Sequence, residues 1–260
     1  MRTQHLRPED RRHEIVEMLV EQGSATLEAL SEHFGVSKMT IHRDLDALEA
    51  EGRLRKLRGS ATLESSGQFE SDFRYRARMA GEEKARIARH VASFVEPGMS
   101  VMVDDGSTSQ ALAPHLAAIR PLTVITNNLG LIADLSGRQG IELIALGGNY
   151  ASKFNGFFGV LTETALRDLR ADMALISSSA VSGRSAFHQD QEVLGVKRAM
   201  IASAARRYLM VDHQKFGRNA LHLLADLGDF DGVVTSGALD HTQADALRQD
   251  GIRLHFAEGD

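Results

Sequence analysis

Apolar residues in the first 60 positions recur at the spacing of an α-helix. Three sets follow this spacing: Ile15, Met18 and Leu19; Leu27, Leu30 and Phe34; and Ile41, Leu45 and Leu48. Thr26 and Ser37 precede the second and third sets and can cap the N-termini of these helices. Gly23, Gly35 and Gly52 follow the three sets and can end the helices. The pattern therefore predicts three short amphipathic helices.

Beyond Glu83 the pattern changes to helices that alternate with short apolar strands. Predicted helices cover residues 82–95, 109–119, 129–136, 162–169, 192–207 and 241–251. Predicted strands cover residues 100–106, 122–128, 141–148, 173–179, 208–212, 232–236 and 253–257. Such alternation is typical of an open, mostly parallel α/β sheet with crossover helices, whose ligands bind at the carboxyl ends of the strands.

A polar stretch separates these two patterns. We therefore expect an N-terminal domain over residues 1–61, a linker with a possible connecting helix over residues 62–82, and a C-terminal domain over residues 83–260. A chain of 260 residues with 43% apolar residues can bury one large core and one small one.

Composition excludes several classes of chemistry. The chain has no cysteine, so disulfides, thiol nucleophiles and cysteine-built zinc sites are impossible. The eleven histidines show no His-Glu-x-x-His spacing, and we expect neither a metal nor a cofactor. The N-terminus lacks an apolar signal segment, and no apolar run approaches the roughly 18 residues of a membrane span. The sequence thus predicts a soluble protein of the cytoplasm that does not enter a membrane.

Cations are concentrated in one place although the net charge is -5. The third predicted helix presents polar and cationic residues opposite its apolar stripe, as insertion into the major groove of DNA requires. Its candidate base readers are Ser37, Lys38, Met39, Thr40, His42 and Arg43. The following segment suits a hairpin that turns Leu54 and Leu57 inward and presents cations to phosphates. These candidate phosphate contacts are Arg53, Arg55, Lys56 and Arg58; a solvated charge run is the alternative.

Polar residues follow several predicted strands of the second half. A turn rich in Gly, Ser and Thr precedes the helix at residues 109–119 and could bind an anion such as a phosphate, although an ordinary capped turn has the same sequence. The candidate ligand-binding residues are Asp104, Gly106, Ser107, Thr108, Ser109, Asn127, Gly147, Gly148, Asp212 and Lys215. Their shared position at strand ends indicates a pocket.

Both halves resemble the DeoR family of bacterial transcriptional regulators. "VSKMTIHRDLDALEAEG" is similar to the winged helix-turn-helix of that family, and the resemblance runs from Arg11 to Ala61. "DDGSTSQALAPHL", "LTVITNNLGLIADL" and "VKRAMIASAARRYLMVDHQKFGRNAL" are similar to its effector domain, which resembles ribose-5-phosphate isomerase. The resemblance implies a repressor of sugar or polyol genes that binds double-stranded operator DNA, responds to a phosphorylated sugar and forms a dimer or tetramer.

An active phosphosugar isomerase with an attached DNA-binding domain is the rival interpretation. Aldose-ketose isomerisation needs a carboxylate base beside the substrate. In the isomerases this base lies at the start of the helix that corresponds to residues 192–207, and the matching position here is Arg198. Arginine cannot abstract a proton, although Glu192 lies nearby in the sequence. We therefore expect a sensor rather than an enzyme.

Overall fold

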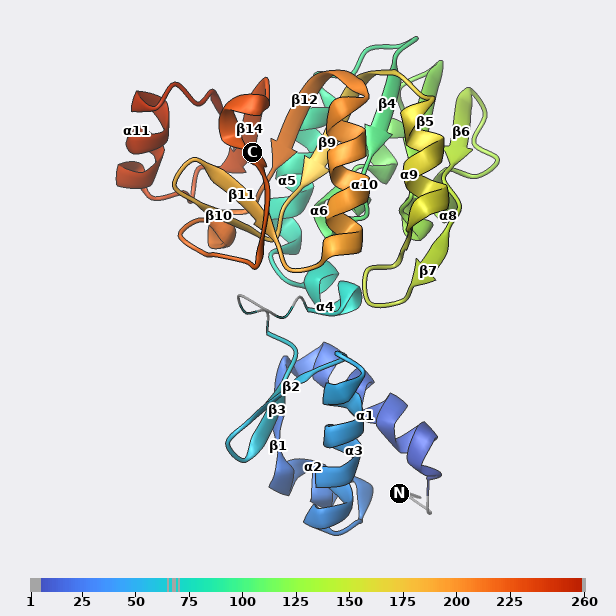
Figure 1. The fold of residues 1–260 in the computed structure, drawn as a ribbon, viewed down its shortest axis with the longest axis vertical. Helices are drawn as coiled ribbons and strands as arrows, with labels where there is room; N and C mark the ends of the chain where they lie inside the picture. The colour runs from blue at the N-terminus through green and yellow to red at the C-terminus, as the bar shows by residue number, and fades with distance from the viewer. Residues whose placement is uncertain (1–5, 65, 67–68, 70, 259–260) are drawn as a thin grey trace. The chain divides into compact units, whose positions relative to one another are not determined.

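The computed structural model of the chain describes residues 6–64, 66, 69 and 71–258 and divides the chain into two units, Met1–Met79 and Ala80–Asp260 (Figure 1). Within the expected linker, Ser65, Gly67, Gln68 and Glu70 lie outside the described residues. Each unit has its own hydrophobic core. Among the described helices, none combines the length and the apolar composition that a membrane span requires.

The first unit is a helical bundle with a small sheet. Its elements are α1 (Pro8–Gln22), β1 (Ser24–Thr26), α2 (Leu27–Phe34), α3 (Lys38–Ala50), β2 (Arg55–Leu57), β3 (Ser60–Thr62) and α4 (Phe73–Arg78). Thr26 caps α2 by accepting a hydrogen bond from the Ala29 N–H at 3.1 Å, and Ser37 caps α3 by accepting one from the Thr40 N–H at 3.2 Å. The three predicted helices and their caps are therefore confirmed.

The core of this unit consists of the predicted apolar stripes. Fully buried residues of the three helices are Ile15, Val16, Leu19, Leu30, Ile41, Leu45 and Leu48. Tyr75 of α4, within the expected linker, packs against the same core. Since an amphipathic helix gains its stability mainly by burying its apolar face, the shared core fixes α3 against α1 and α2.

Strands β2 and β3 form the predicted hairpin, and β1 pairs with β3 to complete an antiparallel sheet in the order β1-β3-β2. Leu54 is buried, as predicted, but Leu57 is 49% exposed at the end of β2. The prediction that both leucines point inward was therefore wrong. Residues three positions apart in an extended chain face opposite sides, so Leu54 and Leu57 cannot both reach the core.

The second unit alternates strands and helices. Its elements are α5 (Gly81–Ala92), β4 (Ser100–Val103), α6 (Ser107–Gln110), α7 (Ala113–Leu116), β5 (Leu122–Thr126), α8 (Leu129–Leu135), β6 (Ile141–Ala145), β7 (Asn149–Ala151), β8 (Gly156–Phe158), α9 (Val160–Arg167), β9 (Ala171–Ser177), β10 (Ala180–Ser182), β11 (Ser185–His188), α10 (Gln191–Ala202), β12 (Ala204–Met210), the 3-10 turn η1 (His213–Lys215), β13 (His222–Asp226), the 3-10 turn η2 (Leu227–Asp229), β14 (Gly232–Ser236), α11 (His241–Gln249) and β15 (Leu254–Ala257).

Seven parallel strands form the main sheet in the order β15-β14-β12-β9-β4-β5-β6. The predicted fold class, a winged helix-turn-helix followed by an open parallel α/β domain, is thus confirmed. The chain adds β5 and β6 on one side of β4 and then β9, β12, β14 and β15 on the other. Strand order therefore reverses between β4 and β9, where sheets of this kind form a crevice at their carboxyl ends.

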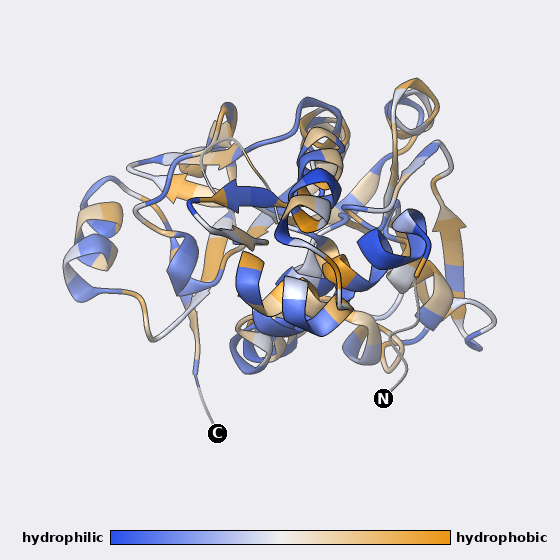
Figure 2. Cartoon of the chain, turned by 90° about the horizontal axis from the view of Figure 1, so that it is seen from below, coloured by the Kyte–Doolittle hydropathy of each residue, from blue (hydrophilic) through white to orange (hydrophobic). Residues whose placement is uncertain are grey.

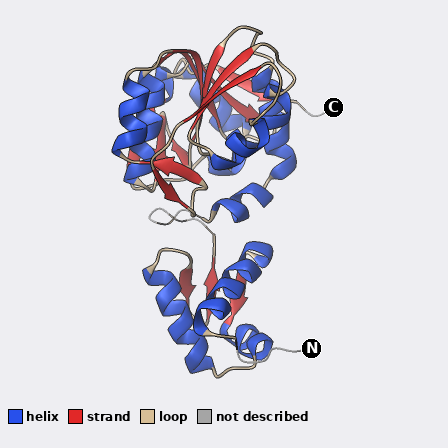
Figure 3. Ribbon diagram, turned by 90° about the vertical axis from the view of Figure 1, so that its right-hand side faces the viewer, coloured by secondary structure: helices blue, strands red, loops and turns tan. Residues whose placement is uncertain are grey.

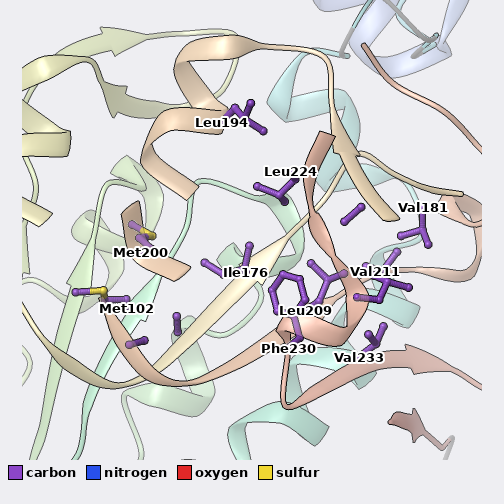
Figure 4. Close-up of a cluster of buried hydrophobic side chains, with 14 of the residues drawn as sticks. Met102, Ile176, Val181, Leu194, Met200, Leu209, Val211, Leu224, Phe230 and Val233 are labelled. Carbon is purple, nitrogen blue, oxygen red and sulfur yellow. The ribbon is translucent and has the colours of Figure 1, made fainter. Parts of the chain in front are cut away.

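Helices cover both faces of this sheet (Figure 3). Val101 and Val103 of β4 pack in the layer with α5, α7 and α8, whereas Met102 packs in the opposite layer with α9, α10 and α11. The second layer includes Ile176, Leu209 and Met200 (Figure 4). Along the helices, hydrophilic residues alternate with hydrophobic ones (Figure 2). Burial on both faces explains the continuous apolar strands of the sequence.

Two helix predictions were wrong in detail. The helix expected at residues 109–119 is broken into α6 and α7, because a continuous helix would bring the ring of Pro114 against the carbonyl group of Gln110. The helix expected at residues 192–207 ends at Ala202, and residues 204–207 begin β12, where they pair with β9. The hairpin β7-β8 and the small sheet β10-β11-β13 were not predicted.

Candidate functional site

The outer face of α3 carries most of the candidate base readers. Ser37, Lys38, Met39 and Arg43 are exposed, while Thr40 and His42 are half-buried. Thr40 shares a 2.9 Å hydrogen bond with Ser37 at the N-terminus of the helix. Met39 is 63% exposed, which is unusual for a large apolar side chain on a folded helix and leaves it available for thymine methyl groups.

The cations of the hairpin have different surroundings. Arg58 lies exposed in the turn between β2 and β3, and Arg55 donates to the Glu64 carbonyl at 3.2 Å. Arg53 lies 3.8 Å from Glu51, and Lys56 pairs with Asp46 of α3. Lys38 likewise pairs with Glu28 of α2. Lys38 and Lys56 must therefore leave these carboxylates before they can neutralise a phosphate.

A second site lies where the strand order reverses in the main sheet. Asp104 follows β4 and is fully buried, with both carboxylate oxygens engaged. Its Oδ2 accepts from the Ser177 N–H at 2.6 Å and from Lys197 Nζ at 2.5 Å, and its Oδ1 accepts from the Gly106 N–H at 3.0 Å and from Ser109. Asp104 therefore ties the turn after β4 to the end of β9 and to α10.

Lys197 is the main residue of this site that the sequence analysis missed. It is 1% exposed, and its Nζ lies 2.5 Å from Asp104 and 3.1 Å from Asp105. Burial alone would lower the pKa of Lys197, but the two carboxylates outweigh it and raise that pKa. The sequence did contain a sign that Lys197 is buried. This charged residue lies on the apolar stripe of α10, four residues after Val193 and three before Met200.

The same contacts keep Asp104 ionised. Burial would raise the pKa of its carboxyl group, but the charge of Lys197 and the hydrogen bonds from Lys197, Ser109 and Ser177 lower it. The result is a compact cluster of one ammonium and two carboxylates at the strand ends. The contacts of this cluster join the turn after β4, the end of β9 and α10.

Close packing explains two of the predicted glycines. A Cβ atom on Gly106 would lie 2.0 Å from Ser177 Oγ, so the turn after β4 can approach β9 only with glycine. At Gly148, where φ is 149°, a Cβ atom would lie 2.3 Å from Thr162 Oγ1 and 2.5 Å from the Phe158 carbonyl oxygen. Both positions therefore require glycine for close packing at the carboxyl ends of the strands.

Two buried polar atoms beside β4 have no hydrogen-bond partner among the described residues. Asn127 Oδ1 lies after β5, where the side chain itself is 0% exposed, and Ser178 Oγ lies after β9. Asn127 Nδ2 meanwhile donates to the Phe157 carbonyl at 3.0 Å, which fixes the side chain. Since buried polar groups are nearly always paired, these two atoms are candidate hydrogen-bonding partners for a polar ligand.

The remaining candidates extend along the same sheet edge. Asp212 is buried at the end of β12, and Lys215 is half-buried at the end of η1. Gly147 lies at the end of β6, on the other side of β4. From β12 to β6 there are four strand intervals, a span of about 19 Å at roughly 4.8 Å each. The ten predicted residues are therefore spread along this row, after β12, β4, β5 and β6.

Arg198 does not face this edge. Its guanidinium donates to the carbonyl oxygens of Leu224 at 3.2 Å and of Leu223 at 2.5 Å, on the small sheet. The residue of α10 that reaches the strand ends is Lys197, which is locked between two carboxylates. Neither Arg198 nor Lys197 therefore offers a carboxylate base at these strand ends.

Comparison with known proteins extends over both units. A family model described as the DeoR C-terminal sensor domain matches residues 79–237, and one described as a DeoR-like helix-turn-helix domain matches residues 11–67. An uncharacterised HTH-type transcriptional regulator of Escherichia coli, YgbI, is 31% identical over 253 residues, covering 97% of this chain and 99% of that protein. The glycerol-3-phosphate regulon repressor of Escherichia coli is 34% identical over 226 residues, covering 86% and 89%.

Further similarity is found in other bacteria and in solved structures. The HTH-type transcriptional repressor GlcR of Bacillus subtilis is 31% identical over 252 residues, covering 97% of both chains. A structure of D-ribose-5-phosphate isomerase in complex with phospho-erythronic acid matches 52% of this chain and 54% of its own, at 15% identity and a TM-score of 0.40.

Proposed function

Because this chain belongs to the DeoR family of bacterial transcriptional regulators, we propose that it represses genes of sugar or polyol metabolism in response to a phosphorylated sugar. Its helix-turn-helix domain binds DNA and its sensor domain binds a small molecule. Two relatives that cover most of the chain are named repressors, and one of these is named for the glycerol-3-phosphate regulon. Those names support repression and a phosphate ester as effector.

In the first unit, α3 enters the major groove and the β2-β3 hairpin follows the phosphate backbone. The observation that carries this assignment is the exposed face of α3, where Met39 and Arg43 project beside Lys38. Arg43 reads base edges, while Arg53, Arg55, Lys56 and Arg58 neutralise phosphates. In this proposal the hairpin fixes the position of the protein on the DNA, and α3 determines which base sequence it binds.

In the second unit, the effector binds at the carboxyl ends of β4, β5, β9 and β12. The unpartnered Asn127 Oδ1 and Ser178 Oγ carry this assignment, because each atom can form a hydrogen bond with a hydroxyl group of a sugar. The phosphate lies near Gly106 to Ser109 and Lys215. Asp104 and Ser109, which are fully buried, shape this site through the Lys197 cluster.

The chain is a regulator and not an isomerase. Its relatives over most of its length are named transcriptional regulators and repressors. We place it in the cytoplasm, where the bacterial chromosome lies. A dimer or tetramer fits the two-fold symmetry of most operators, and the C-terminal unit mediates this association.

Replacing Arg43 and Arg55 separates base reading from phosphate contact. In mobility-shift titrations with DNA that flanks its own gene, Arg43→Ala is expected to lose about 1–3 kcal/mol of discrimination between this DNA and unrelated sequence. Arg55→Ala is expected to weaken binding to all sequences and to reduce the salt slope by about 0.9. Arg167→Ala removes the same charge from an exposed position in the second unit. This control should change neither the discrimination between sequences nor the salt slope. If the wild-type protein shifts no fragment even at low salt, the proposed function fails.

Replacing Lys215 tests the sensor. Glycerol 3-phosphate, glucose 6-phosphate and fructose 6-phosphate are titrated into the wild-type complex with DNA, and we expect at least one to weaken it. Lys215→Ala should abolish this response and leave DNA affinity without effector unchanged, because the cation that neutralises the phosphate is gone. Arg138→Ala, at the opposite edge of the sheet, is the charge-matched control. An undiminished response in Lys215→Ala would rule out this pocket.

A further inference from the structure

Glu83 is a buried carboxylate in the first turn of α5, outside the set of effector candidates. The residue is 6% exposed, and both of its carboxylate oxygens accept hydrogen bonds. A buried carboxylate is costly unless it is paired and hydrogen-bonded, so its partners must be held in place. These partners connect α5 to the edge of the sheet where the effector is placed.

Two of the three hydrogen bonds come from one residue. The His213 N–H donates to Glu83 Oε1 at 2.8 Å, and His213 Nδ1 lies 2.8 Å from Glu83 Oε2, where it donates in the Nδ1-protonated tautomer. Ser236 Oγ, at the end of β14, donates to Glu83 Oε1 at 2.6 Å. Glu83 therefore links two segments through hydrogen bonds: the chain just after β12 and the end of β14.

His213 is the first residue of η1, between the effector candidates Asp212 and Lys215. Within this turn the Lys215 N–H donates to the Asp212 carbonyl at 3.1 Å, and the Phe216 N–H donates to the His213 carbonyl at 3.3 Å. Glu83 binds the backbone N–H at the beginning of the turn as well as the ring. The orientation of the turn, and with it the Lys215 ammonium, depends on this carboxylate.

The helix that carries Glu83 follows directly from the first unit. That unit ends at Met79, and α5 begins at Gly81 after Ala80, whose φ of 52° is left-handed. Only three residues separate Glu83 from Met79 in the sequence. A change at the start of α5 therefore acts on the peptide that joins the two units, whatever their relative placement.

We propose that Glu83 is the positioning residue that holds the Asp212–Lys215 turn for the effector and couples this turn to the start of α5. An effector changes DNA affinity only if it binds two states of the protein with different affinity. When the Asp212–Lys215 turn moves toward a bound phosphate, His213 moves with it. The two hydrogen bonds between His213 and Glu83 then displace Glu83 at the start of α5. The inference rests on the proposed function, since it assigns a route from the effector site to the DNA-binding unit.

Glu83→Gln tests this coupling with little change in volume. The glutamine amide can accept on one side only, so its NH2 group meets a donor from His213 or Ser236. In the ligand-free protein, we expect faster hydrogen exchange in residues 212–216 and 81–84 and wild-type exchange in α8 and β6. The ratio of DNA dissociation constants with and without the active sugar phosphate should fall from about 5–150-fold to within about twofold of unity.

Matched variants separate coupling from stability. Glu82→Gln changes an exposed neighbour and should behave as wild type in both measurements. His213→Ala removes the ring contact but keeps the backbone N–H, so it should give an intermediate ratio even if Glu83→Gln does not fold. A merely structural role for Glu83 would lower the melting temperature but leave the ratio of DNA dissociation constants at the wild-type value, which would overturn the proposal. If no sugar phosphate affects wild type, the sensor assignment fails, whereas the exchange result still decides whether Glu83 holds the turn.

Discussion

Lys197→Met is expected to lower the unfolding free energy of the C-terminal unit by about 3–5 kcal/mol, the usual loss when one member of a buried ion pair is removed. Asp104 and Asp105 are 0% and 1% exposed, and both would lose the ammonium group that lies 2.5 Å and 3.1 Å from their carboxylates. Methionine fills much of the volume of lysine, so the loss reports charge and hydrogen bonding rather than a cavity. Ser177 Oγ also loses its 3.2 Å contact with Lys197 Nζ.

Urea unfolding followed by hydrogen exchange and mass spectrometry measures this effect in each unit separately. Lys215→Met makes the same chemical change at a half-buried position and should shift stability by no more than about 0.5 kcal/mol. Peptides from α1, α2 and α3 should unfold at the wild-type urea concentration in both variants. Equal stability of Lys197→Met and Lys215→Met would show that the buried cluster contributes nothing beyond packing.

The sequence predicted the regular elements because their apolar periodicity is local. In the first unit, Thr26 and Ser37 combine capping chemistry with the start of an apolar stripe, so the helix boundaries could be placed closely. In the second unit, the main strands are buried on both faces and stand out as short apolar runs. Strand order did not follow from these runs, since it depends on which helices cover which face.

The elements that were missed depend on tertiary contacts. Strands β7, β8 and β10 have three residues each, too short for alternation to be recognised. Residues 204–207 resemble a helix end, but pairing with β9 in the centre of the sheet makes them a strand.

The candidate site was predicted in outline. Chain order placed polar residues at strand ends, and parallel strands bring those ends to one edge. Lys197 and Glu83 were missed because each lies on a helix, where sequence alone does not show which strand end a side chain reaches. A charged residue within an apolar helical stripe is the local sign that applies to Lys197.

Arg11→Met is expected to unfold the N-terminal unit and to abolish DNA binding while the C-terminal unit stays folded. Arg11 on α1 and Asp44 on α3 form an ion pair at 2.6 Å, with side chains 9% and 7% exposed, and Arg11 also donates to the Leu6 carbonyl at 3.1 Å. Removing the arginine leaves the Asp44 carboxylate buried without its cation, at a cost of about 3–5 kcal/mol. A unit of this size gains only about 3–5 kcal/mol from its core, so this loss is comparable to its whole stability.

The two units make the Arg11 result easy to distinguish from a change in base reading. Asp44 is adjacent to Arg43 on α3, but it faces the core, so Arg11→Met should lose binding to every sequence together with exchange protection in residues 8–50. Protection in the main sheet, and the binding of any active sugar phosphate, should remain at wild-type values. Arg12→Met, at a half-buried position next in the chain, is expected to stay within about 0.5 kcal/mol of wild type. Retained protection of residues 8–50 in Arg11→Met would mean that α3 is held against α1 by its apolar stripe alone.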